Sequence, residues 1–260
     1  MLPIGDDNYG RRKTPYMTWL IIAVNIFVFI FYQKFGQNEA FESSFATVPG
    51  ELLSGRDIVT QAQRVTDPST GAVEMVPGLG VTPIWVYFTI FTSMFMHGSL
   101  SHIFGNMLFL GIFGDNVEAR LGHFRYLAFY LISGVIAALS QTLFSGLGAV
   151  LTGDASFLLT PMVGASGAIS GVLGAYLVLF PGNKVYVLLF NFIPSAFHAW
   201  LVIGLWFVMQ VLGGLSGWSQ GGVAYFAHIG GFLTGFLWGR HLRKQARRRY
   251  YYPSSNYYNN

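Results

Sequence analysis

The chain has 260 residues, of which 53% are hydrophobic, 17% aromatic and 10% charged, and its formal net charge is +4. Soluble globular domains carry about 25% charged residues, so the composition excludes an ordinary soluble domain and favours one membrane bundle. The absence of cysteine excludes disulfides and thiolate-ligated zinc or iron–sulfur sites. The first nine residues carry Asp6 and Asp7 and no basic residue, which does not fit a signal or transit peptide.

Six apolar stretches are candidates for membrane-spanning helices, because a hydrocarbon core of about 30 Å requires about 20 residues. They are expected at about 16–35, 99–113, 124–144, 162–180, within 185–212, and at 223–239. Pro194 interrupts the fifth stretch, and Pro181-Gly182-Asn183-Lys184 predicts a tight turn before it. The sequence therefore predicts an all-α membrane protein with a bundle of six transmembrane helices.

The regions outside the bundle differ from it in composition. Residues 37–83 are polar and turn-rich, which predicts a large external loop between the first two helices, with short amphipathic pieces around 51–63. Residues 1–15 form an N-terminal segment ahead of the bundle of residues 16–240. Residues 241–260 are basic and rich in tyrosine, and we expect this tail to be disordered.

Basic residues collect on one side of the predicted bundle. All Lys and Arg residues except Lys34, Arg56 and Arg64 fall in the two termini or in the connections after the second and fourth helices. Because Lys and Arg are retained on the cytoplasmic side, we expect both termini in the cytoplasm, in a prokaryotic cell membrane. The basic tail then anchors the topology and contacts anionic lipid, and binding of nucleic acid is not expected.

Ser166 and His228 stand near the same end of the predicted fourth and sixth helices. With a rise of 1.5 Å per residue, both would lie about 6 to 8 Å below the membrane surface. A serine hydroxyl becomes a nucleophile when a base about 3 Å away accepts its proton, and imidazole titrates in the right range. No acidic residue falls in the fourth, fifth or sixth stretch. The sequence predicts a serine–histidine dyad, with Ser166 as nucleophile and His228 as general base.

Small residues near this pair would allow the two helices to approach closely. They are Gly164, Gly167, Gly171 and Gly174 around the fourth stretch and Gly231 and Gly235 in the sixth. Small residues four positions apart are how membrane helices pack tightly, and such spacing alone indicates ordinary helix packing.

His102 and Asn106 lie one helical turn apart in the second stretch. Both side chains can donate hydrogen bonds, and with the backbone N–H of Ser166 they could hold the oxyanion of a tetrahedral intermediate. The alternative is that His102 and Asn106 are a polar pair that only stabilises helix contacts. Ser170, one turn deeper than Ser166, is the weaker candidate nucleophile, and His97 is interpreted as structural or interfacial.

These residues together resemble a known family. The motifs His102-xxx-Asn106, Gly164-x-Ser166-Gly167 and Ala227-His228-xx-Gly231-xxx-Gly235, in this order over about residues 84–239, are similar to those of the rhomboid intramembrane proteases. The resemblance implies peptide-bond hydrolysis in or beside transmembrane helices of other membrane proteins, without metal or cofactor. It also implies a structural role for Glu118 and Arg120, which resemble a Glu-x-Arg pair that ties together the loop after the second helix.

The sequence departs from the family in two places. The Trp-Arg pair that many members carry in the first external loop is absent, and Ser170 stands where members often have an aromatic residue. A catalytically inactive relative that binds membrane clients is the alternative function, although such relatives usually lose the serine or the histidine. A zinc metalloprotease would need a His-Glu-x-x-His string, which the sequence lacks. The substrate and the oligomeric state stay open.

Overall fold

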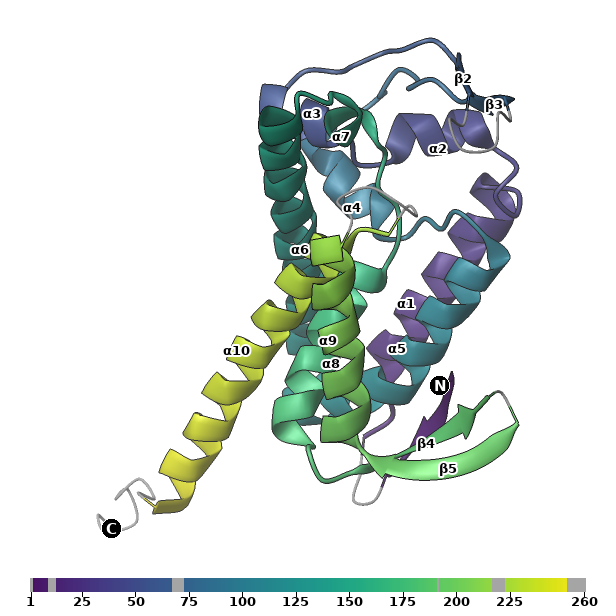
Figure 1. The fold of residues 1–260 in the computed structure, drawn as a ribbon. Coiled ribbons are helices and arrows are strands. Elements are labelled where there is room, and N and C mark those ends of the chain that lie inside the picture. The colour runs from purple at the N-terminus through teal and green to yellow at the C-terminus, as the bar shows by residue number, and fades with distance from the viewer. Residues whose placement is uncertain (1, 9–12, 67–72, 191, 217–222, 252–260) are drawn as a thin grey trace.

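The computed structural model describes residues 2–8, 13–66, 73–190, 192–216 and 223–251, and its long helices form a bundle (Figure 1). The long helices are α1 (Tyr16–Phe27, continued by the π-helical turn Val28–Tyr32), α5 (Leu100–Leu121), α6 (His123–Thr152), α8 (Ser166–Leu179), α9 (Ala199–Ser216) and α10 (Tyr225–Tyr251). The short helices are α2 (Glu39–Phe45), α3 (Pro49–Ser54), the 3₁₀ turn Val86–Phe88, α4 (Thr89–Ser93) and α7 (Ser156–Leu159). The strands are β1 (Leu2–Asp6), β2 (Gln63–Thr66), β3 (Val73–Val76), β4 (Lys184–Leu189) and β5 (Ile193–His198).

Helix α8 forms the centre of the bundle. Nearly all of its residues are buried, and it packs against α5, α6, α9 and α10. Glycines set its distance from α10: a Cβ at Gly231 would overlap the carbonyl oxygen of Gly167, and a Cβ at Gly235 would overlap that of Gly171. The two backbones are therefore in direct contact, which is the geometry that small-residue spacing permits in membrane helices.

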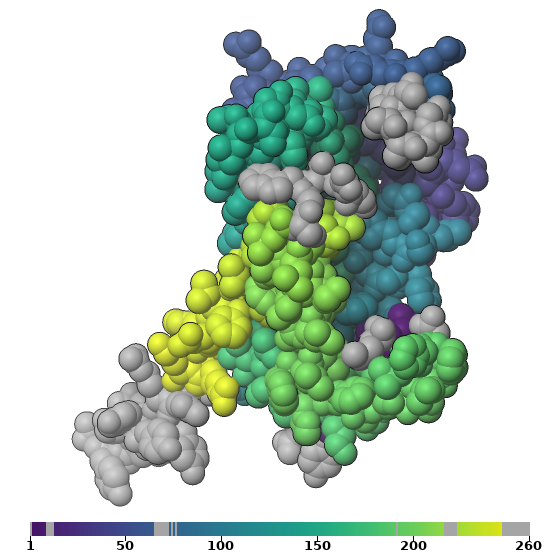
Figure 2. Space-filling view, in the orientation of Figure 1, coloured from purple at the N-terminus to yellow at the C-terminus, as the bar shows by residue number. Residues whose placement is uncertain are grey.

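Helix α9 lies on the outside of the bundle, where Figure 2 shows it in green across the front. Its outer face exposes Trp200, Leu205, Met209 and Leu212. Among the described helices, α6 is both long enough and apolar enough to cross a membrane by length and composition. The segments Tyr16–Tyr32, Ser166–Leu179 and Ala199–Leu215 are apolar and shorter.

The prediction for the fifth stretch is wrong in its first half. The segment forms an antiparallel hairpin of β4 and β5 before α9 begins at Ala199, and β1 adds to β4 as a third strand (Figure 1). Pro194 has no N–H to donate, so it cannot continue a helix, whereas an edge strand such as β5 tolerates it. The helix in this stretch is therefore shorter than predicted and starts later, at Ala199.

The fourth helix also starts later than predicted. Thr47 and Met162 exchange two backbone hydrogen bonds of 3.1 and 2.8 Å, and the Gly164 N–H donates to the Ser93 carbonyl at 2.9 Å. These contacts hold residues 162–164 in an extended path, and α8 begins at Ser166 instead of Met162. Ser166 therefore starts the helix and does not lie one turn inside it.

The remaining predictions concern the ends of the chain and the polar segment. Residues 37–83 contain α2, α3 and the β2–β3 hairpin. Helix α10 continues to Tyr251, where a disordered tail was expected, and residues 252–260 lie outside the described residues. The N-terminal segment is attached to α5 and α8, because the Asp6 carboxylate accepts hydrogen bonds from Asn116 Nδ2, at 2.7 Å, and from the Tyr176 hydroxyl.

Candidate active site

Ser166 is the first residue of α8, directly after a turn that contains Gly164. Gly164 has a φ of +133°, a conformation that side-chain-bearing residues rarely adopt. This turn brings the extended segment to the start of α8. The first N–H groups of a helix have no partner within it and carry the positive end of the helix dipole. The Ser166 hydroxyl is thus placed beside backbone donors suited to a developing negative charge.

His228 reaches Ser166 from α10. Its Nε2 lies 2.8 Å from the Ser166 Oγ, so the two side chains are hydrogen-bonded. The start of α10 is held by Gln141 of α6, whose Oε1 accepts from the backbone N–H groups of Phe226 and Ala227 at 3.1 and 3.3 Å. This cap, with the glycine contacts between α8 and α10, fixes the position of the imidazole.

His102 and Asn106 approach the same point from α5. A Cβ at Gly164 would lie 3.0 Å from the His102 Nε2, so the imidazole packs directly on the turn before Ser166. Asn106 is 8% exposed, and its Nδ2 has no hydrogen-bond partner among the described residues. Both side chains line a cavity of about 760 Å³ together with Ser166 and His228. A buried donor without a partner is available for a ligand or a reacting oxygen.

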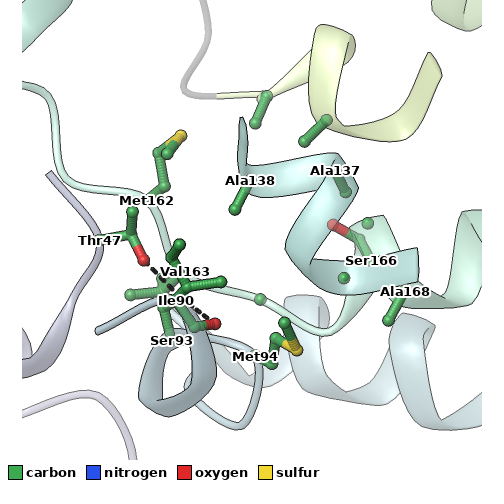
Figure 3. A pocket seen from close by; sticks show the side chains of 15 residues that line it. Thr47, Ile90, Ser93, Met94, Ala137, Ala138, Met162, Val163, Ser166 and Ala168 are labelled. Carbon is green, nitrogen blue, oxygen red and sulfur yellow. Dashed lines mark hydrogen bonds between the residues drawn. The ribbon is translucent and has the colours of Figure 1, made fainter. Parts of the chain in front are cut away.

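A second and much smaller cavity, of about 40 Å³, adjoins Ser166 on the side of α6. Figure 3 shows Ser166 beside Ala137, with the hydrogen-bonded pair Thr47 and Ser93, whose hydroxyl oxygens are 2.8 Å apart, at the far side of this cavity. The walls are mostly small or apolar side chains. This second cavity accommodates a small group only.

Other residues that the sequence singled out have different positions. Ser170 is buried, and its hydroxyl donates to the Ser166 carbonyl at 2.6 Å. The hydroxyl proton of Ser170 is therefore already engaged in a hydrogen bond. Gly164 lies in the turn before α8 and is not a helix-packing residue. Glu118 is fully buried and accepts from the Thr18 N–H and hydroxyl at 2.8 and 2.7 Å, so it joins the end of α5 to the start of α1. Arg120 is exposed.

Two residues next to His228 were not identified as candidate site residues from the sequence. Gln210 of α9 places its Oε1 2.7 Å from the His228 Nδ1, and the ring of Trp206, one turn earlier, lies 6.0 Å from the imidazole ring. A glutamine within an apolar stretch is a usable signal, because polar groups at membrane depth usually have a function. The predicted fifth stretch, within residues 185–212, includes Gln210, but the sequence alone does not show that this side chain faces His228.

These features define a helical membrane protein with a serine–histidine pair at the end of a buried helix. The family model described as "Rhomboid domain" matches residues 85–245. The chain therefore belongs to the rhomboid family, as the motifs indicated.

Individual relatives support the same family. The chain is 30% identical over 161 residues to "Rhomboid protein 1, mitochondrial" of Saccharomyces cerevisiae, covering 62% of this chain and 43% of that protein. It is 26% identical over 246 residues to "RHOMBOID-like protein 7" of Arabidopsis thaliana, covering 90% and 70%. It is 34% identical over 147 residues to the human "Presenilin-associated rhomboid-like protein, mitochondrial", covering 56% and 35%. The matches thus span less than half of the yeast and human proteins.

The relatives contradict the expected location. They come from eukaryotes, and the yeast and human proteins are named mitochondrial. The prediction of a prokaryotic cell membrane with both termini in the cytoplasm is therefore wrong. Counting Lys and Arg separates the two sides of a bundle, but it carries no information about which membrane holds the bundle.

Proposed function

We propose that the chain is an intramembrane serine endopeptidase that cleaves peptide bonds in or near transmembrane helices of other membrane proteins. The observation that carries the proposal is the 2.8 Å contact between Ser166 Oγ and His228 Nε2 at the wall of the large cavity. A hydroxyl bonded to an imidazole and facing an accessible space is an activated nucleophile. The family of the chain supports the same chemistry.

The chemistry follows from the positions of the side chains. Ser166 Oγ attacks the carbonyl carbon of the scissile bond while His228 Nε2 takes the hydroxyl proton. His102, Asn106 and the Ser166 N–H donate to the oxyanion of the tetrahedral intermediate. The C–N bond then breaks, the proton on Nε2 passes to the leaving nitrogen, and an acyl-enzyme remains. His228 next deprotonates a water that attacks the acyl carbon, and the new carboxyl product leaves as Ser166 regains its proton.

The membrane arrangement that fits this reaction has six spans, α1, α5, α6, α8, α9 and α10, with residues 37–83 as a large loop on one side. Helix α8 has 14 residues and is about 21 Å long, which is shorter than a hydrocarbon core of about 30 Å. Ser166 at its start is then below the membrane surface, within reach of a substrate helix. The names of the yeast and human relatives favour a mitochondrial membrane, and lipids surround the exposed apolar helix faces.

The test is cleavage of a model transmembrane substrate by the detergent-solubilised chain, with Ser166→Ala in parallel. The wild-type chain should produce a defined pair of fragments, and a mechanism-based serine reagent should label it at Ser166. The Ser166→Ala variant should neither cleave the substrate nor be labelled. Cleavage by both chains would contradict the role of Ser166. Retention of the substrate by the wild type without cleavage or labelling would favour the inactive, client-binding alternative.

A further inference from the structure

Both nitrogens of the His228 imidazole have a partner in the protein. Nε2 faces the Ser166 hydroxyl at 2.8 Å, and Nδ1 faces Oε1 of Gln210 at 2.7 Å. The two partners come from α8 and α9, which both pack against α10. The ring is therefore held at both of its hydrogen-bonding atoms, and its rotation is restricted.

The second contact decides which tautomer the imidazole adopts. A neutral imidazole carries one N–H, and its other nitrogen accepts. To take the proton of Ser166 at Nε2, the ring must carry its hydrogen on Nδ1, and an acceptor at Nδ1 stabilises this tautomer. The amide oxygen of Gln210 is such an acceptor. The described parts of α8, α9 and α10 contain no Asp or Glu that could take this place.

We propose that Gln210 is a positioning residue for the general base, an inference that rests on the proposed protease function. Gln210 accepts the Nδ1–H of His228 and keeps Nε2 directed at Ser166. No proton moves to Gln210: the hydroxyl proton goes to Nε2, and the Nδ1–H stays on Nδ1 throughout. After proton transfer the same oxygen accepts from the imidazolium, where a hydrogen bond to a charged donor is stronger than to a neutral one.

The location of Gln210 allows an effect on the position of His228 to be distinguished from an effect on substrate binding. Trp206 lines the large cavity, whereas Gln210 is not among the residues that line it. A substrate in the cavity can therefore contact Trp206 without contacting Gln210. Loss of the Gln210 amide should lower the rate of the chemical step and leave substrate binding unchanged, which is the pattern of an interaction that matters mainly in the transition state.

The experiment compares Gln210→Leu and Gln210→Glu with the wild-type chain in the cleavage and labelling assays. Gln210→Leu keeps the bulk and removes the acceptor, so kcat should fall about 10- to 100-fold, the usual loss when a partner that orients a functional histidine is removed. KM should not change, and labelling of Ser166 should slow in parallel. Gln210→Glu keeps an oxygen acceptor at the same reach and should restore most of kcat.

The control is Met209→Leu, because Met209 is adjacent on α9 and 57% exposed. It should behave as the wild type, and thermal melts in detergent should show that all variants fold. A folded Gln210→Leu with wild-type kcat would overturn the inference, and so would equal losses in Gln210→Leu and Gln210→Glu. If the wild-type chain itself neither cleaved nor labelled, the proposed function would fall first, and this inference with it.

Discussion

The Nε2 of His228 lies 2.8 Å from the Ser166 Oγ, although 62 residues separate the two in the chain. The distance depends on the contact between α8 and α10, where the backbone of α10 at Gly231 and Gly235 lies directly on the carbonyls of α8. A change in helix spacing of about 1 Å would break the hydrogen bond, because such bonds weaken beyond about 3.2 Å. The hydrogen bond between Ser166 and His228 is therefore coupled to helix packing.

The first prediction tests this coupling with Gly235→Ala. The new Cβ would overlap the Gly171 carbonyl oxygen, so α10 must shift away from α8. Overpacking of this kind costs about 1 to 3 kcal/mol, and thermal melts in detergent should show the loss together with reduced cleavage. The matched control is Gly204→Ala in α9, whose Cβ would meet nothing within 4 Å. If Gly235→Ala kept both stability and activity, the close approach of the two helices would be irrelevant to the site.

The second prediction concerns the base. His228→Ala removes the acceptor of the Ser166 proton, so the hydroxyl stays protonated at neutral pH. Cleavage should drop to background, and the serine reagent should no longer label Ser166. Peptide mapping identifies the labelled position. An adduct on Ser170, or labelling as fast as in the wild type, would show that the roles are assigned wrongly.

The third prediction separates the proposed oxyanion donors from the proposed reacting pair. Asn106→Ala and His102→Ala each leave the Ser166 N–H and the other side chain in place, so the rate should fall by about 10 to 10³ instead of to background. Since Asn106 Nδ2 has no partner among the described residues, Asn106→Ala removes no hydrogen bond of that atom, and its melting temperature should be unchanged. Full activity in both folded variants would support the alternative, a polar pair that only stabilises helix contacts.

The fourth prediction concerns Glu51 of α3, outside the predicted spans. Burial raises the pKa of its carboxyl, partly offset by the hydrogen bond from the Ile58 N–H, while the charge of Asp57 raises it further. A raised pKa means that the folded state binds the proton more tightly than the unfolded state, so stability should fall as pH rises from the unfolded pKa, about 4.3, through the folded one.

Melting temperatures measured across this pH range should reveal the contribution of Glu51. Glu51→Gln keeps the acceptor for Ile58 and removes the titration, so its melting temperature should depend less on pH than that of the wild type and should be higher at neutral pH. An unchanged pH dependence in Glu51→Gln would show that other groups are responsible.

Several features could be predicted from the sequence because they depend on local patterns. Long apolar runs with few charges indicate membrane helices, since each backbone N–H and C=O must find its partner inside the segment. The spacing of Ser166 and His228 from the ends of two such runs predicted that their side chains could meet, and they lie 2.8 Å apart. The motifs around them indicated the rhomboid family, which the match over residues 85–245 confirms.

Other features were decided only by contacts between distant segments. The fourth helix starts at Ser166 because Met162 pairs with Thr47 and Gly164 donates to Ser93, and neither partner can be recognised from the sequence near Ser166. The apolar residues of β4 and β5 resemble part of a helix, yet they form strands, which pair with each other and with the N-terminal strand β1. Gln210 reaches His228 only once α9 begins after that hairpin. Periodicity reports how a segment buries its own side chains, whereas hydrogen bonds between segments depend on the whole fold. The pairing of Ser166 with His228 could therefore be predicted from sequence motifs, and the contact of His228 with Gln210 could not.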